Sequence, residues 1–295
     1  MSEKCIIFIL GVGRSGTSAL TRVLSLCGCV LPNALLGAND ANPRGFWEPC
    51  DAVKINDEFL FRHGSTPFDP TMRLQEELCL DVTEREDFVG RIREFLAGCP
   101  SGPLLVIKDP RITPLFEFWL EAARRNAFAV KVVVPVRAPS EVAASAAVLG
   151  VSAELSNTIW LKCNLLAERH SRDLPRVTVR YENLLANWRA EVSRISQRLD
   201  IPLRLDRASD IDQFLSPDLH RQRDSTPPAD VFRVTWISRV YAVLSGAAED
   251  VPIEQSSMDE IYEAYRACER VFRVSLDDFR GKFSPEILYG HGKGD

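Results

Sequence analysis

The chain has 295 residues, of which 45% are hydrophobic and 26% are charged, values typical of a soluble globular protein with room for a sizeable core. Its formal net charge of −5 argues against a general nucleic-acid-binding protein, because such proteins present a broad basic surface to the phosphate backbone. No apolar run approaches the ~18 residues of a membrane span, and the first residues lack the pattern of a secretory leader. We therefore expect a cytoplasmic protein with eight reduced cysteines and no metal site.

A short apolar run at residues 5–10 leads into a glycine-containing loop at residues 11–18. The run is β-branched and too short for an ordinary helix, which favours a buried strand. From Thr17 the apolar residues recur three and four positions apart, as in an amphipathic helix that Gly28 can close. A turn of this kind directs backbone N–H groups and a helix N-terminus at one point, which favours an anion. The pattern predicts a phosphate-binding loop formed by Gly13, Arg14, Ser15, Gly16, Thr17 and Ser18.

The loop departs from the nucleoside-triphosphate pattern at one position. The spacing Gly11-x-x-x-x-Gly16 matches the Walker A motif, but Thr17-Ser18 follows where Lys-Ser or Lys-Thr is expected. The missing lysine would reach the β- and γ-phosphates, whereas here the positive charge lies inside the loop at Arg14. The loop therefore indicates a different anion.

Strands and helices alternate through the first 185 residues. This alternation favours a P-loop-like α/β fold, in which helices cover both faces of a parallel sheet. After the strand at 5–10 and its helix, we predict further strands at 103–108, 129–136 and 176–180. We predict helices at 50–62, 81–96, 141–149 and 153–171. A further helix is expected to begin at Pro114, with Thr113 as its N-cap.

The remainder of the chain is mostly helical. We predict helices at 184–199, 229–246 and 257–271, with a hinge at Pro227-Pro228. The whole chain, residues 1–295, is expected to form one domain, with a core sheet in residues 1–185 and a helical C-terminal part in residues 186–295.

Cations follow the predicted strands directly. Lys108 ends the second strand, Arg111 lies three residues on, and Arg137 follows the third strand. The carboxyl ends of parallel strands meet at one edge of a sheet, where ligands of such folds bind. Together with Arg14, these positive charges would repel one another unless an anion joins them.

The loop at residues 11–18 resembles the 5′-phosphosulfate loop of the sulfotransferases that use 3′-phosphoadenosine 5′-phosphosulfate (PAPS). In that family an Arg after a later strand and a Ser eight residues on hold the 3′-phosphate, and Arg137 and Ser145 have this spacing. The segment 179–185 is similar to the strand end where the family places a Tyr near the adenine, which implies that role for Tyr181.

The family resemblance also implies catalytic residues. Many small-molecule sulfotransferases have a catalytic His after the second strand, but here the sequence is Lys-Asp-Pro-Arg at 108–111. This segment looks more like the protein-tyrosine sulfotransferases, whose base is a Glu from the loop after the first helix. Glu48 is the corresponding candidate, in a loop that we expect to be mobile, and Asp109 is the alternative base. Lys108 and Arg14 would stabilise the leaving phosphate, while Arg44 and Trp47 are candidates for shaping the acceptor site.

The resemblance implies transfer of a sulfonate to the hydroxyl of a small molecule, sugar, lipid or peptide, with release of 3′-phosphoadenosine 5′-phosphate (PAP). A P-loop nucleotide kinase is an alternative, for which Asp109 is a weak candidate to hold Mg²⁺. A non-catalytic nucleotide-binding protein would keep Arg14 and Arg137 without needing Glu48 or Lys108. The roles of the basic residues His220, Arg221 and Arg223 stay open.

Overall fold

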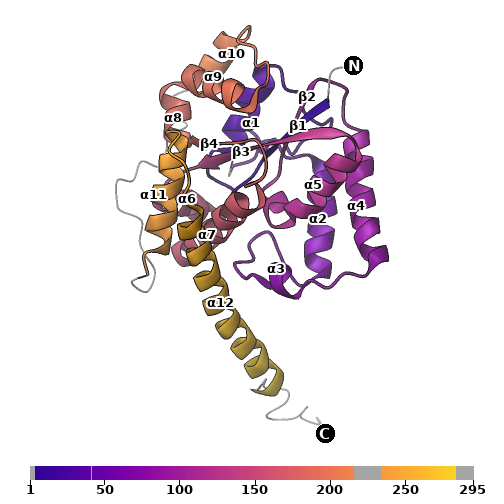
Figure 1. Cartoon of the computed structure of the whole chain (residues 1–295), viewed down its shortest axis with the longest axis vertical. Coiled ribbons are helices and arrows are strands. Elements are labelled where there is room, and N and C mark those ends of the chain that lie inside the picture. The colour runs from indigo at the N-terminus through magenta and orange to yellow at the C-terminus, as the bar shows by residue number, and fades with distance from the viewer. Residues whose placement is uncertain (1–3, 41, 216–233, 284–295) are drawn as a thin grey trace.

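The computed structural model describes residues 4–40, 42–215 and 234–283 (Figure 1). Its central sheet has four parallel strands: β1 (Lys4–Ile9), β2 (Leu104–Lys108), β3 (Phe128–Val136) and β4 (Arg176–Arg180). They lie in the order β2-β1-β3-β4. The two inner strands, β1 and β3, are neighbours although β2 lies between them in the chain, so the strand order reverses at this pair. Ligands of doubly wound sheets bind beside such a reversal.

Helices cover both faces of this sheet, which confirms the predicted P-loop-like α/β fold. The side chains of β1 alternate between two hydrophobic clusters, with Ile6 and Phe8 in one and Ile7 and Ile9 in the other. The first cluster packs against α2 (Cys50–Arg62), α4 (Val82–Ala97), α5 (Phe116–Arg125), α7 (Ala153–His170), α11 (Trp236–Ala248) and α12 (Gln255–Phe283). The second packs against α1 (Thr17–Leu26), α8 (Tyr181–Ala186), α9 (Trp188–Leu199) and α10 (Ala208–Phe214).

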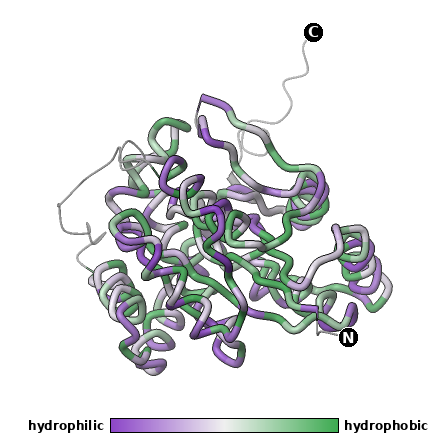
Figure 2. The backbone as a smooth tube through the Cα atoms, turned by 90° about the horizontal axis from the view of Figure 1, so that it is seen from above, coloured by the Kyte–Doolittle hydropathy of each residue, from purple (hydrophilic) through white to green (hydrophobic). Residues whose placement is uncertain are grey.

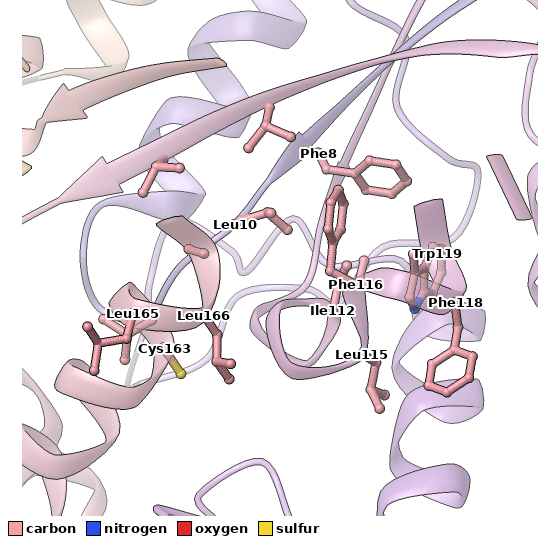
Figure 3. Packing of buried hydrophobic residues seen from close by; sticks show 14 of the residues in the cluster. Phe8, Leu10, Ile112, Leu115, Phe116, Phe118, Trp119, Cys163, Leu165 and Leu166 are labelled. Carbon is pink, nitrogen blue, oxygen red and sulfur yellow. The ribbon is translucent and has the colours of Figure 1, made fainter. Parts of the chain in front are cut away.

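Several aromatic side chains pack together in the first cluster (Figure 3). The ring of Phe8 meets the rings of Phe116 and Trp119 edge-on, with centroid separations of 5.5 and 6.1 Å. Such edge contacts add to the stabilisation that burial of the rings provides. Figure 2 shows hydrophobic stretches of the chain, in green, running through the middle of the molecule. The sheet is therefore held rigidly on both faces, which gives its loop-bearing edge a fixed frame.

The prediction that Thr113 caps a helix beginning at Pro114 is wrong. Residues Pro110–Leu115 form a 3-10 helix (η1). The Asp109 side chain caps the N-terminus of this helix by accepting a hydrogen bond from the Arg111 N–H. The Thr113 hydroxyl is fully buried and instead accepts from the Gly11 N–H at 2.9 Å and donates to the Gly11 carbonyl at 3.1 Å. A contact far along the chain thus replaces the local cap, and it fixes the start of the phosphate loop.

Other boundaries differ in smaller ways. The predicted helix at 184–199 is divided at Asn187, whose side chain caps α9 by accepting from the Ala190 N–H at 3.2 Å. The predicted helix at 141–149 consists of α6 (Pro139–Ala146) and a 3-10 turn, Ala147–Leu149. A short helix, α3 (Arg73–Glu77), was not predicted.

The C-terminal helices differ most from their predicted bounds. Helix α12 runs to Phe283 and extends away from the sheet (Figure 1). His220, Arg221, Arg223 and the predicted hinge at Pro227-Pro228 lie outside the described residues. Within the described ranges, no helix combines the length and apolar character needed to cross a membrane.

Candidate active site

The phosphate loop connects β1 to α1 through backbone conformations that few residues tolerate. Gly11, Arg14 and Gly16 have φ angles of 130°, 69° and 84°. At Gly16 a Cβ atom would lie 2.2 Å from the ring of Tyr181, so both the left-handed backbone and the packing require glycine. Tyr181 begins α8 after β4, and its buried ring therefore packs directly on the loop.

The N-terminus of α1 lies at this loop without a side-chain cap among the described residues. The first N–H groups of a helix have no partner within the helix and favour an anion. Gly16, Thr17 and Ser18, which begin the helix, all line a cavity of about 510 Å³. This end of the helix can thus hold a phosphate or sulfate group.

The same cavity brings together nearly all the predicted site residues. It is lined by Gly13, Arg14, Gly16, Thr17, Ser18, Glu48, Lys108, Arg137, Ser145 and Tyr181. Ser15 is the exception, because its side chain is fully buried and does not line the cavity. Its hydroxyl oxygen has no hydrogen-bond partner within the described residues.

Arg14, Ser145 and Arg137 form a connected group at the cavity wall. Arg14 Nε donates to Ser145 Oγ at 2.9 Å, and Arg137 Nη1 donates to the Arg14 carbonyl oxygen at 3.3 Å. Arg137 Nε also donates to Glu141 at 2.7 Å, and its guanidinium lies 4.9 Å from the centroid of the Tyr181 ring. Burial, and then the charge of Arg137, lower the pKa of Arg14. The two guanidinium groups are therefore close enough to act on one ligand.

Lys108 and Glu48 form a buried ion pair in the same cavity. The distance between Lys108 Nζ and Glu48 Oε1 is 2.5 Å, and the two residues are 2% and 6% exposed. Lys108 Nζ also contacts the Phe46 carbonyl oxygen at 3.2 Å and Ser18 Oγ at 3.4 Å. These contacts attach the loop carrying Glu48 to the first turn of α1.

Glu48 is held on its other side as well. Its Oε2 accepts from Arg111 Nη1 at 3.2 Å, and its carbonyl oxygen accepts from the Leu36 N–H at 2.8 Å. These contacts hold Glu48 on both sides in the long loop after α1, and the mobility of this loop stays a prediction.

Asp109, the alternative base, lies behind the cavity rather than in its wall. Its side chain is completely buried and accepts hydrogen bonds from Asn56 at 2.9 Å and from Arg111 Nη1 at 2.9 Å. Burial raises the pKa of Asp109, against the opposing effect of Arg111. The two carboxyl groups share Arg111 Nη1, but of the two only Glu48 lines the cavity.

Arg44 and Trp47, the candidates for shaping the acceptor site, also have different positions. Arg44 lines both the first cavity and a second cavity of about 460 Å³, whereas Trp47 lines the second cavity and not the first. The Trp47 indole N–H donates to the Arg44 carbonyl oxygen at 2.9 Å, and the Arg22 guanidinium lies 4.7 Å from its ring centroid. Trp47 therefore supports the loop next to Glu48 by packing.

Sequence reasoning missed the apolar residues of the cavity wall. They come from separate segments, so no periodic pattern joins them, and they include Leu36, Pro67, Phe68, Val142, Leu149, Val151, Ile159 and Phe214.

The family model of the sulfotransferases matches residues 7–205. The chain belongs to the sulfotransferase family. The match spans about two thirds of this sulfotransferase, from β1 through the phosphate loop, Glu48, Lys108 and Arg137 to α9. No curated protein matches the chain.

Two solved structures are similar to this sulfotransferase. The sulfotransferase domain of the Synechococcus PCC 7002 olefin synthase is 20% identical, with a TM-score of 0.49 over 85% of this chain and 97% of that chain. The sulfotransferase domain of the curacin biosynthetic pathway is 17% identical, with a TM-score of 0.43 over 90% of this chain and 98% of that chain.

Proposed function

We propose that this sulfotransferase uses PAPS as its donor and transfers the sulfonate to an acceptor hydroxyl, with Glu48 as base and Lys108 beside the leaving phosphate. One observation carries the proposal: the cavity at the N-terminus of α1 contains the Lys108–Glu48 pair together with Arg14, Arg137 and Ser145. A binding protein would need the phosphate ligands alone, whereas transfer also needs a base and a cation at the reacting atoms.

The residues present fit the donor. The uncapped N-terminus of α1 and Arg14 would hold the 5′-phosphosulfate, while Arg137 and Ser145 would hold the 3′-phosphate and Tyr181 would lie near the adenine. The 2.9 Å bond between Arg14 and Ser145 makes these two phosphate sites adjacent. The half-buried guanidinium of Arg14 and the buried one of Arg137 also provide the concentrated positive charge that a polyanionic nucleotide needs in an otherwise acidic protein.

PAPS would supply the sulfonate. As the acceptor oxygen forms its bond to sulfur, the electron pair of the broken sulfur–oxygen bond would stay on PAP, and Glu48 would take the acceptor's proton. Proton uptake by Glu48 removes the negative charge that holds Lys108 at 2.5 Å. The Lys108 ammonium group can then donate a hydrogen bond to the oxygen of the leaving phosphate, on which negative charge develops. Arg111 remains beside Glu48 and keeps its side chain oriented toward the cavity.

Glu48 is the better choice of base than Asp109, because Asp109 does not line the cavity and its oxygens are held by Asn56 and Arg111. The choice agrees with the tyrosine-sulfotransferase-like Lys-Asp-Pro segment at residues 108–110. A peptide hydroxyl therefore belongs among the acceptors to be compared, together with sugars, lipids and small molecules.

A ligand-stabilisation experiment tests the donor. The unfolding temperature is measured with PAP, with ATP–Mg²⁺ and in buffer. A ligand at a hundredfold excess over its Kd adds ~2.7 kcal/mol if it binds the folded state alone, so PAP should raise the unfolding temperature clearly and ATP–Mg²⁺ should not. Stabilisation by ATP–Mg²⁺ alone would favour the kinase alternative. Stabilisation by PAP without PAP release from PAPS, across a broad acceptor panel, would favour a non-catalytic nucleotide-binding protein.

A further inference from the structure

The cavity has an apolar wall as well as a charged one. Apolar side chains reach it from the loop after α1, the loop after α2, the turn after α6 and helix α7. The residues that matter here are Leu36, Pro67, Phe68, Leu149, Val151 and Ile159. None of them belongs to the phosphate loop or to the groups predicted to hold the nucleotide.

The charges of the cavity lie on other segments. Within the described lining, the residues contributed by 65–70 and 147–159 are Pro67, Phe68, Leu149, Val151, Ser156 and Ile159, and none of them is charged. A sugar placed against this wall would lose hydrogen bonds to water without replacing them. An apolar surface gains from the same removal of water.

Two members of this wall leave large apolar surfaces uncovered. Phe68 is 50% exposed and Leu149 is 46% exposed, and both line the cavity. Isolated exposed apolar residues are common on proteins, but two that face the same cavity provide a surface that an apolar ligand would cover.

The segment that carries Phe68 is held in place by polar contacts from behind. Ser65 Oγ donates to the Asp69 side chain at 2.7 Å, and Lys162 Nζ donates to the Asp69 carbonyl oxygen at 2.9 Å. The Tyr265 hydroxyl donates to the Pro70 carbonyl oxygen. Lys162 comes from α7 and Tyr265 from α12, and both are buried. This segment of the wall is therefore held in place without a ligand, which lowers the entropic cost of binding.

We propose that the acceptor is an alcohol with an apolar body, aliphatic or aromatic, and that Phe68 and Leu149 contact this body while its hydroxyl reaches Glu48. The inference rests on the proposed function, because it concerns the second substrate of the same cavity.

Acceptor preference is tested with PAPS and four probes: 1-octanol, 2-naphthol, N-acetylglucosamine and a tyrosine-containing peptide. Release of PAP is followed for each. We expect kcat/KM for at least one of the two apolar alcohols to exceed that for the sugar and the peptide by at least about tenfold. The octanol and naphthol arms distinguish an aliphatic body from an aromatic one. A preference for the sugar or for the peptide would overturn the inference.

Matched variants test the two contacts. Phe68→Ser and Leu149→Ser should each weaken binding of the preferred alcohol to the PAP-bound protein by about tenfold in calorimetry. Phe61→Ser and Val148→Ser are the controls, because these residues are 60% and 68% exposed but do not line the cavity, and they should leave binding unchanged. An equal loss of alcohol affinity in the two wall variants and in the two control variants would overturn the inference.

Two outcomes separate this inference from the proposed function. Failure of PAP to stabilise the protein would overturn the proposed function as well. Stabilisation by PAP with unchanged alcohol binding in Phe68→Ser and Leu149→Ser would overturn only the acceptor class.

Discussion

Lys108 Nζ lies 2.5 Å from Glu48 Oε1, although 60 positions separate the two residues in the chain. Removing an ammonium and a carboxylate from water is unfavourable unless both are paired and hydrogen-bonded. Arg111 on Glu48, and the Phe46 carbonyl and Ser18 hydroxyl on Lys108, supply these additional partners. The pair therefore connects the proposed base directly to the proposed stabiliser of the leaving group.

Glu48→Gln should abolish most of the turnover. The substitution keeps the size of the side chain and one hydrogen-bond acceptor but removes the base, so kcat should fall by ~10²–10⁴ while PAP affinity barely changes. Steady-state kinetics and calorimetry with PAP measure the two effects. Glu117→Gln, in a side chain that is 62% exposed, is the control. Near-normal turnover would move the base to a group on the acceptor, and a rise in acceptor KM alone would make Glu48 a binding residue.

Lys108→Met should lower stability as well as turnover. The buried Glu48 carboxylate would keep Arg111 but lose its closer partner, and breaking a buried pair costs up to ~3–5 kcal/mol. Urea unfolding of Lys108→Met, Glu48→Gln and the double variant gives the coupling between the two side chains. The double variant should lose less free energy of unfolding than the two single variants lose in sum. Simple additivity would show that the ion pair is not energetically significant.

Arg137→Ala should discriminate between nucleotides. Loss of a charge-assisted contact is worth ~1.5–3 kcal/mol, so PAP should bind more weakly, while the analogue without the 3′-phosphate should be little affected. Competition binding at fixed salt measures both affinities, and Arg198→Ala, in a side chain that is 52% exposed, is the control. Equal losses for the two nucleotides would assign Arg137 a structural role through its bond to Glu141.

Gly16→Ala should disrupt the phosphate loop. The added Cβ would lie 2.2 Å from the Tyr181 ring in a backbone with φ of 84°, so both the loop and the ring must move. We expect a loss of stability of at least ~1 kcal/mol and loss of PAP binding. Tyr181→Ala in the same chain should restore part of the stability by removing the clash, as measured by denaturant unfolding. If stability in the double variant falls by the sum of the two single losses, steric contact is not the cause.

His170 should make stability depend on pH. Burial lowers the pKa of this side chain from 6.5 to about 4, and within the described residues its Nδ1 has no hydrogen-bond partner. As the pH falls below 6.5, the unfolded state takes up the proton first, so stability is lost progressively down to about pH 4, by up to ~3 kcal/mol. His170→Phe, which retains a ring against Phe116, should lose less stability over this range in urea titrations. An identical dependence of stability on pH in the His170→Phe variant and the unmodified protein would exclude His170 as the source of this dependence.

The sequence by itself determined most of the strands and helices and much of the site. Strand and helix periodicity depends on neighbours a few positions apart, so the apolar run before Gly11 and the helix at Cys50–Arg62 are visible locally. Arg14, Lys108 and Arg137 follow strands, and the parallel order of those strands is enough to bring them to one edge.

Only the tertiary structure decided how these groups pair. Thr113 binds the backbone of Gly11 rather than capping a helix. The ring of Tyr181 packs against Gly16. Glu48 lies between Lys108 and Arg111. Each contact joins segments that are distant in the chain and is favoured because burial removes competing water from the polar groups or fills space with a ring. The apolar wall around Phe68 belongs to the same class, because its members share a cavity but no sequence pattern. Long-range packing cannot be read from local residue spacing.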